Sequence, residues 1–191
     1  MKKLISGIMA VAMALSLAAC QKETKVISLS GKTMGTTYHV KYLDEGSMKA
    51  TSEKTHEEIE AILKDVNAKM STYKKDSELS RFNQNTQVNT PIEISADFAK
   101  VLAEAIRLNK VTEGALDVTV GPVVNLWGFG PEKRPEKQPT PEQLAERQAW
   151  VGIDKIALDM SAAKPTLSKA LPQVYVDLSS IRSEERRVGK E

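Results

Sequence analysis

The chain has 191 residues, of which 41% are apolar and 5% aromatic, and its formal net charge at pH 7 is +2. This length and composition are typical of a globular protein with one ordinary hydrophobic core. The near balance of 27 basic and 25 acidic residues excludes a strongly basic surface for nucleic acid or anionic membranes. Cys20 is the only cysteine, which excludes an internal disulfide and a thiolate metal cluster.

Residues 1–19 have the pattern of a secretory signal peptide. Lys2 and Lys3 supply its positive start, and residues 4–19 are uncharged and rich in Ala, Leu, Ile and Met. This run is shorter than the roughly 20 apolar residues that a membrane-spanning helix needs. It ends in Leu-Ala-Ala-Cys, which predicts cleavage before Cys20 and lipidation of that cysteine. The alternative is a plain signal peptide with an incidental cysteine.

Residues 20–29 are expected to form a tether between the lipid and the folded domain. A lipid on Cys20, rather than surface charge, would then hold the protein to the membrane. Gln21 follows that cysteine where an inner-membrane protein would have aspartate, which favours the outer membrane in a cell that has both.

The folded domain is predicted to begin with a strand and a helix. Residues 36–42 alternate between apolar and polar side chains, which predicts a half-buried strand, and a turn follows at residues 44–47. Thr55 and Glu58 have the spacing of a capping box. The apolar side chains after them recur at helical spacing as far as Met70, which predicts an amphipathic helix over residues 55–70.

The rest of the chain predicts further helices and short strands. A second helix begins at Ser95 and ends near Gly114, and an irregular segment follows over residues 114–131. Thr140 and Gln143 form a capping box that starts a short helix. Short strands are predicted at residues 156–160, 166–169 and 174–178, the first two joined as a hairpin. This order indicates a mixed α+β domain rather than a regular βαβ series.

Residues 71–83, after the first helix, are a candidate ligand-binding segment. They gather several hydroxyl side chains around Tyr73 and end in an arginine, a phenylalanine and an asparagine. Tyr73 could stack on a planar ligand. The alternative is a capped surface turn with Tyr73 and Phe82 in the core, because Ser, Thr, Asp and Asn are common in turns.

Residues 114–122 and 125–130 form a second candidate. Their glycines allow a ligand to approach the backbone, and Asp117 offers a carboxylate to a ring N–H or a ribose hydroxyl. The segment is neither a GxGxxG motif nor a P-loop. A ligand loop and a purely structural loop are equally supported, since Gly, Pro and Trp also build rigid turns.

These segments, taken in order, resemble the ApbE family of FAD:protein FMN transferases. The resemblance runs from about residue 30 to residue 181. It implies an α+β fold with an ApbE-like mixed sheet and flanking helices. Many family members are lipoproteins on the periplasmic side of the membrane, in line with the prediction for Cys20. The similar blocks are residues 32–36, 71–83, 114–122, 125–130 and 176–181.

The resemblance implies a magnesium-dependent transfer reaction. FAD is the substrate, AMP leaves, and FMN becomes a phosphoester on a threonine of a partner protein. The partners implied are flavin-carrying subunits of the Nqr-type sodium-pumping NADH:quinone oxidoreductase and of its Rnf relatives. Such chemistry fits metal-assisted phosphoryl transfer.

The resemblance also implies site residues, carried over position by position. A main-chain oxygen at Ser180 matches a ligand of Mg²⁺, a cation that prefers oxygen donors. Tyr73 matches the residue that stacks on the flavin, and Asp117 matches a polar contact. The positions that match FAD contacts are Met34, Tyr73, Ala115, Leu116 and Asp117.

The end of the chain departs from the family pattern. Residues 182–191 are abruptly charged and are interpreted as a foreign tail, similar to translated sequencing-adapter sequence. Residues 30–181 are then the N-terminal part of the transferase domain, whose C-terminal half is missing. The intact gene product is expected to be an enzyme and the chain as written to be inactive. Two alternatives are a lipoprotein that only binds or hydrolyses FAD, and a non-catalytic lipoprotein scaffold.

Overall fold

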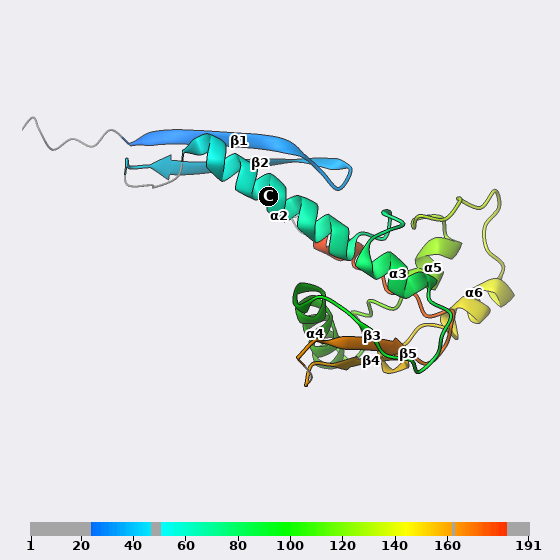
Figure 1. Ribbon diagram of the computed structural model, residues 1–191. Coiled ribbons are helices and arrows are strands. Elements are labelled where there is room, and N and C mark those ends of the chain that lie inside the picture. Colours follow the sequence, from blue (N-terminus) through cyan, green and yellow to red (C-terminus); the bar gives the residue numbers. More distant parts are fainter. Residues whose placement is uncertain (1–23, 47–50, 162, 183–191) are drawn as a thin grey trace, which may run out of the picture. The chain divides into compact units, whose positions relative to one another are not determined.

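The computed structural model describes residues 24–46, 51–161 and 163–182. The predicted signal peptide, the lipidation site Cys20, and residues 183–191 lie outside these ranges. The chain divides into two compact units, one ending at Ala61 and one beginning at Ile62, and Figure 1 shows the elements of each. Within the described ranges, no helix has the length and apolar character needed to cross a membrane.

The first unit is built on a long β-hairpin. Strand β1 (Lys25–Thr33) pairs antiparallel with strand β2 (Thr36–Asp44) along its whole length. The predicted strand at residues 36–42 is confirmed. Residues 25–29 of the expected tether lie in β1, because β2 gives their backbone groups a pairing partner.

Tyr38 is the centre of a polar cluster in the first unit. Helix α2 (Ser52–Met70) begins in this unit and carries His56 and Glu60. The Tyr38 hydroxyl donates to Glu60 Oε1 at 2.5 Å and lies 2.9 Å from His56 Nε2. Burial and the neighbouring Glu60 carboxylate raise the pKa of Tyr38 to about 12. A Cβ at Gly31 would lie 2.6 Å from Tyr38 Cε1 and 2.3 Å from Glu60 Oε1, so a larger residue there would displace both side chains.

Helix α2 begins earlier than the sequence predicts. Thr51 Oγ1 accepts a hydrogen bond from Lys54 N at 3.3 Å, which makes Thr51 the capping residue. Thr55, the predicted cap, lies inside the helix, and its hydroxyl donates to Thr51 O at 3.1 Å. The prediction of a Thr55 capping box is therefore wrong, because Thr51 caps the helix one turn earlier.

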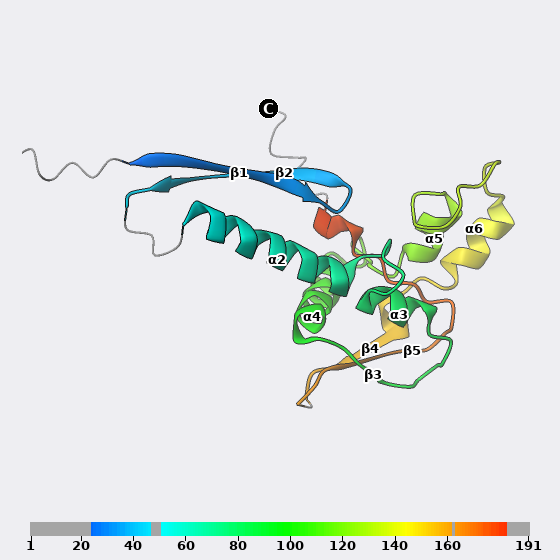
Figure 2. The same ribbon diagram turned by 45° about the horizontal axis from the view of Figure 1, so that its top comes forward.

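The second unit has one core between a small sheet and several helices. The sheet is antiparallel in the order β3-β5-β4, and α4 lies beside it in Figures 1 and 2. The most deeply buried apolar side chains are Leu79, Phe82, Phe98, Leu102, Leu167, Val174 and Val176. The strands are β3 (Ile92–Glu93), β4 (Ile156–Asp159) and β5 (Thr166–Lys169). The helices are α3 (Glu78–Gln84), α4 (Ala96–Val111), α5 (Gly121–Leu126) and α6 (Pro141–Gln148), with 3-10 turns η1 (Ile153–Lys155) and η2 (Ser179–Arg182).

Capping side chains start three of these helices. Ser95 caps α4, and Thr140 and Gln143 form the complete predicted capping box of α6. Ser77 caps α3. This helix is not predicted, because residues 71–83 are interpreted as a ligand-binding segment or a surface turn. Helix α5 is not predicted either, because its N-cap residue Val120 makes no side-chain capping bond.

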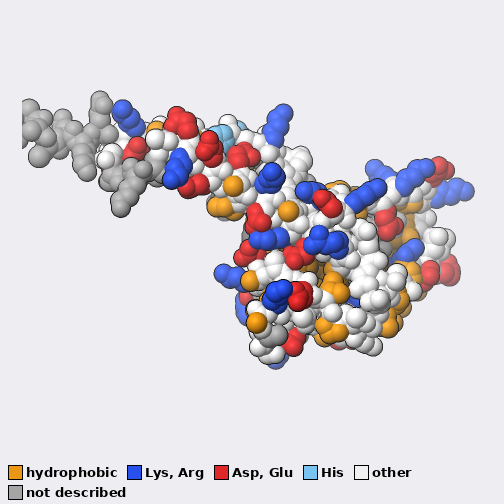
Figure 3. Space-filling view, viewed as in Figure 1, with side chains coloured by type: hydrophobic (Ala, Val, Ile, Leu, Met, Phe, Trp, Pro, Cys, Tyr) orange, Lys and Arg blue, Asp and Glu red, His pale blue; other side chains and the backbone are white. Residues whose placement is uncertain are grey.

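The mixed α+β class predicted from the sequence is confirmed, as is the β4–β5 hairpin. The strand predicted at residues 174–178 is wrong. Only Tyr175 forms a bridge there, to Val120, and the polar backbone groups of Val176 are taken by the Asn83 side chain instead of a neighbouring strand. Acidic and basic side chains are interspersed over the surface seen in Figure 3.

Candidate functional site

The loop after α4 holds the predicted Ala115-Leu116-Asp117 step in a fixed backbone conformation. Gly114 has a φ of 87° and its N–H donates to Asn109 O at 2.8 Å, which ends the helix. Leu116 is then held from both sides, because its N–H donates to Thr112 Oγ1 at 3.1 Å and its carbonyl accepts from Asn109 Nδ2 at 2.7 Å. Ala115 is exposed, and Leu116 and Asp117 are partly buried.

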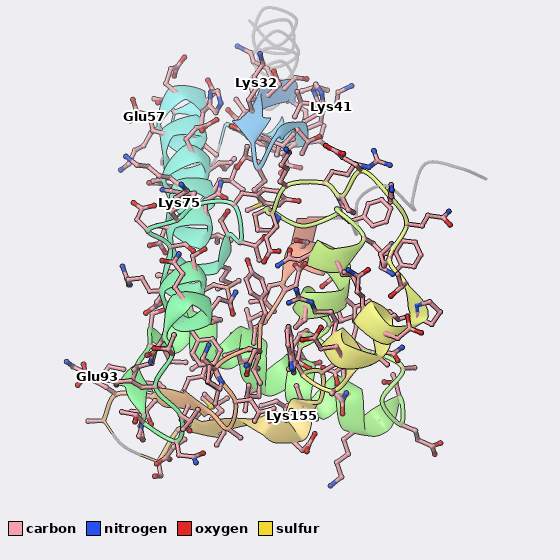
Figure 4. All side chains as sticks on the ribbon, turned by 90° about the vertical axis from the view of Figure 1, so that its right-hand side faces the viewer. Lys32, Lys41, Glu57, Lys75, Glu93 and Lys155 are labelled. Carbon is pink, nitrogen blue, oxygen red and sulfur yellow. The ribbon has the colours of Figure 1, made fainter. Side chains whose placement is uncertain are left out.

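Asp117 organises the next turn through its carboxylate. Oδ1 accepts from the Thr119 N–H at 2.8 Å and from the Thr119 hydroxyl at 2.6 Å, and Oδ2 accepts from the Ile153 N–H at 3.2 Å. The fully buried Thr119 hydroxyl also accepts from the Gly152 N–H at 2.7 Å. Gly152 and Ile153 lie at the start of the 3-10 turn η1. The N–H of Lys155, which is labelled in Figure 4, closes this turn by donating to Gly152 O. Asp117 therefore joins the loop after α4 to the turn before β4.

Residues 118–120 run parallel to residues 175–177. The Asp177 N–H donates to Val118 O at 2.7 Å, and Tyr175 bridges Val120. Gly121 is required at this point, because a Cβ there would lie 2.3 Å from the Tyr175 ring. The Asp177 carboxylate accepts from the Ser179 N–H at 2.7 Å, which starts η2. Burial, and secondarily the charge of Asp177, raise the pKa of Tyr175.

Tyr73, Trp127 and Phe129 are exposed aromatic side chains of the second unit. Tyr73 is 52% exposed, in the loop between α2 and α3 where Lys75 is labelled in Figure 4. Its hydroxyl donates to Phe129 O at 3.2 Å, so two segments distant in the sequence meet there. Phe129 is 71% exposed and Trp127 is 40% exposed. Exposed aromatic rings can stack on a planar ligand. The exposure of Tyr73 contradicts a core position for it, whereas Phe82 lies in the core.

The segment at residues 125–130 combines a structural part with an exposed part. Asn125 is buried, and its Nδ2 donates to Glu132 Oε1 at 3.0 Å. Gly130 packs against Asn125 so closely that a Cβ there would lie 1.7 Å from Oδ1. These contacts fix the loop that carries the exposed Trp127 and Phe129. The interpretation as a rigid structural loop thus describes the packing of Asn125 and Gly130, and the interpretation as a ligand loop stays a prediction.

Ser180 lies in η2 with an exposed side chain. In the described ranges, no group of three or more His, Cys, Asp or Glu side chains is placed to hold a metal ion. Mg²⁺ needs near-octahedral oxygen coordination, usually with a carboxylate. The main-chain oxygen of Ser180 would supply one such donor, and a magnesium site that includes it stays a prediction.

The structure brings together only part of the predicted site. Ala115, Leu116 and Asp117 are linked through Val118 to the segment that leads to Ser180. Met34 belongs to the first unit, where it and Gly35 form the hairpin turn with φ angles of 51° and 74°. A non-glycine residue at positive φ is strained, and such strain is often found at functional positions.

The sequence analysis did not identify Thr119, Tyr175 or Asp177 as parts of this site. Thr119 stands two residues after Asp117, which is the spacing of a side-chain turn and could have been used as a signal. Asp177 and Ser179 repeat the same spacing. Tyr175 has no local signal, because its position depends on a pairing with Val120 that is remote in the sequence.

Comparison with known proteins gives consistent matches. The ApbE family model matches residues 34–184. A Haemophilus influenzae protein named FAD:protein FMN transferase is 94% identical over 181 residues, covering 95% of this chain and 52% of the relative. A Vibrio cholerae protein of the same name is 52% identical over 174 residues, covering 91% of this chain and 50% of the relative. The chain thus spans about half the length of these curated relatives.

Two solved structures have the same fold. The flavin transferase ApbE from Vibrio cholerae matches with a TM-score of 0.77 and 52% identity, over 82% of this chain and 49% of that one. The apo form of Pseudomonas stutzeri flavinyl transferase ApbE matches with a TM-score of 0.76 and 33% identity, over 85% of this chain and 52% of that one. Because the family model matches well over half of the sequence, the chain belongs to the ApbE family.

Proposed function

We propose that the whole protein is an FAD:protein FMN transferase. The observation that carries this proposal is the likeness to solved flavin transferases, at a TM-score of 0.77 and 52% identity. The relative that is 94% identical has the same name. The exposed Tyr73 ring next to Phe129, and the fixed Ala115–Asp117 loop, are features that suit binding of a flavin nucleotide.

The proposed reaction exchanges one phosphate bond for another. The pyrophosphate bond of FAD breaks and AMP leaves, while the FMN phosphorus forms a bond to a threonine oxygen of the acceptor, whose hydroxyl proton is released. In this proposal Tyr73 stacks on the isoalloxazine ring, and Met34, Ala115, Leu116 and Asp117 line the nucleotide. The acceptors would be flavin-carrying subunits of Nqr and Rnf complexes. The whole protein would require Mg²⁺, with the Ser180 carbonyl as one of its oxygen donors.

A full-length chimera tests the proposal. In it, residues 24–181 of this chain replace the matching part of the Haemophilus influenzae relative. Incubated with FAD, Mg²⁺ and an acceptor subunit, it should release AMP and leave flavin fluorescence on the acceptor in a denaturing gel. A chelator should stop both. AMP and FMN without labelled acceptor would instead indicate a hydrolase, and FAD left intact would reject both catalytic functions and favour a scaffold.

Tyr73→Ala in this chimera should weaken FAD binding by about 1–3 kcal/mol, the range for loss of an aromatic stacking contact on a base-like ring. Fluorescence titration of FAD measures the change. Tyr73→Phe is the matched control, because it removes only the hydroxyl that donates to Phe129 O and keeps the ring. FAD affinity that is the same in Tyr73→Ala and the parent would show that this ring does not contact the flavin.

We further propose that the protein is a lipoprotein on the periplasmic side of a membrane, with the outer membrane favoured by Gln21. Support comes from the sequence of residues 1–21 alone. Cys20→Ser should abolish lipidation and leave the protein unprocessed or in the soluble fraction. Mass spectrometry of the mature N-terminus provides the measurement, and an unmodified Cys20 in membrane-purified parent protein would contradict the proposal.

A further inference from the structure

Asn83, near the end of α3, replaces a missing strand neighbour for Val176. Its Nδ2 donates to Val176 O at 2.9 Å, and its Oδ1 accepts from the Val176 N–H at 2.8 Å. Both residues are buried, with 8% of Asn83 and none of Val176 exposed. A side-chain amide has the same donor and acceptor as a peptide group, so it satisfies both polar groups of Val176. Without this amide, the N–H and C=O of Val176 would lie unpaired in the core, which would lower the stability of the fold.

Lys169, the last residue of β5, binds the same region from a second direction. It is 2% exposed, and its ammonium group donates to Asn83 O at 3.0 Å, Pro172 O at 3.1 Å and Val174 O at 3.3 Å. Among the described residues, no carboxylate forms an ion pair with it. Its ammonium group also lies 5.2 Å from the centroid of the Phe82 ring. A buried charge without a carboxylate partner costs more stability than an apolar side chain of similar size. Its position therefore calls for an explanation beyond core packing.

The explanation lies in what these contacts hold. Asn83 and Lys169, here called the clamp, fix the backbone at Val174 and Val176, which flank Tyr175. On its other side the same segment pairs with the candidate site, through the Tyr175–Val120 bridge and the bond from the Asp177 N–H to Val118 O. Val118 directly follows Asp117. A shift of the segment would thus be passed directly to the loop that carries Asp117.

We propose that Asn83 and Lys169 are positioning residues of the flavin site. They contact no substrate themselves; they hold residues 174–177 in the register that keeps the loop around Asp117 in its binding conformation. The inference rests on the proposed transferase function. It explains why an amide and an ammonium group lie buried beside the core residues Val174 and Val176.

The test combines kinetics in the full-length chimera with local exchange in this chain. Asn83→Leu and Lys169→Met should each raise the KM for FAD about tenfold or more while kcat changes by less than about twofold, which is the pattern for lost substrate binding. The double variant should raise KM by less than the product of the two single effects, because the residues act as one unit. In the 191-residue chain, Asn83→Leu should speed amide exchange at Val176 and Asp177.

Leu102→Ala is the control, because it removes a fully buried side chain from α4 and lowers the melting temperature without touching the clamp. When Leu102→Ala lowers the melting temperature as much as the Asn83 and Lys169 variants do, its KM for FAD should still stay near the parent value. An equal rise of KM in Leu102→Ala would show that Asn83 and Lys169 affect FAD binding only through the general stability of the fold. An unchanged KM in Lys169→Met would overturn the proposal even if Asn83→Leu fails to fold. A chimera whose parent form leaves FAD intact rejects the transferase function instead, while unchanged exchange at Val176 and Asp177 rejects the clamp independently.

Discussion

As the pH rises from 8 to 10.5, we expect the second unit of the parent protein to become more stable relative to the Lys169→Met variant. The difference in their free energies of unfolding should grow by up to about 1.4 kcal/mol per pH unit. Burial lowers the pKa of Lys169 from 10.5 to about 8. In this window the unfolded chain still binds the proton that the folded chain has released, so stability increases with pH. Below pH 8 both states are protonated and the difference is constant. Over the whole window the gain reaches about 3 kcal/mol.

Urea unfolding followed by tryptophan fluorescence measures this effect, because Trp127 and Trp150 both lie in the second unit. The comparison with Lys169→Met removes contributions from other groups, which both proteins share. Parallel stability curves for the two proteins from pH 8 to 10 would show that Lys169 keeps its proton in the folded state.

Asp117→Ala should lower the free energy of unfolding of the second unit by about 2–4 kcal/mol. Hydrogen bonds to a charged group contribute about 1.5–3 kcal/mol each, and this carboxylate accepts from the Thr119 N–H, the Thr119 hydroxyl and the Ile153 N–H. The expected loss is smaller than the full sum because Asp117 is only partly buried and water replaces some of these bonds. Urea unfolding at pH 7 gives the value.

Asp117→Asn is the matched control. The amide oxygen can still accept both bonds from Thr119, whereas the amide nitrogen faces the Ile153 N–H and cannot accept from it. Its cost should be close to that of one hydrogen bond, about 1 kcal/mol. Should Asp117→Asn weaken FAD binding in the chimera much more than it lowers stability, the carboxylate contacts the nucleotide as well as its own loop. Equal, large losses of stability in both variants would contradict the assigned hydrogen bonds.

The sequence predicted those features that depend on neighbouring residues. Thr140 and Gln143 identify the start of α6 because the capping bonds run within one turn. Ser95 does the same for α4. Alternation of apolar and polar side chains correctly gave the strand at residues 36–42. The α+β class follows from the order of such local signals.

The parts that could not be predicted depend on remote residues. Residues 174–178 are apolar at alternate positions, as in a strand, yet their partners are the Asn83 side chain and residues 118–120. Lysine is a typical surface residue, yet Lys169 lies in the core, where its ammonium group donates to the remote Asn83 carbonyl as well as to those of Pro172 and Val174. For the candidate site, local patterns single out Tyr73 and Asp117, whose roles stay predictions, whereas the position of Tyr175 depends on its remote pairing with Val120.

The pairing of Asn83 with Val176 also affects the order in which the protein can fold. The two residues are separated by 93 positions in the sequence. The contact can form only when a long loop closes, which is slow compared with pairing between neighbouring segments. Meanwhile the β1–β2 hairpin, joined by a tight turn, can form within microseconds. The surroundings of Asp117 are thus completed after the local elements have formed, and until then the Asn83 amide and the polar groups of Val176 bond to water.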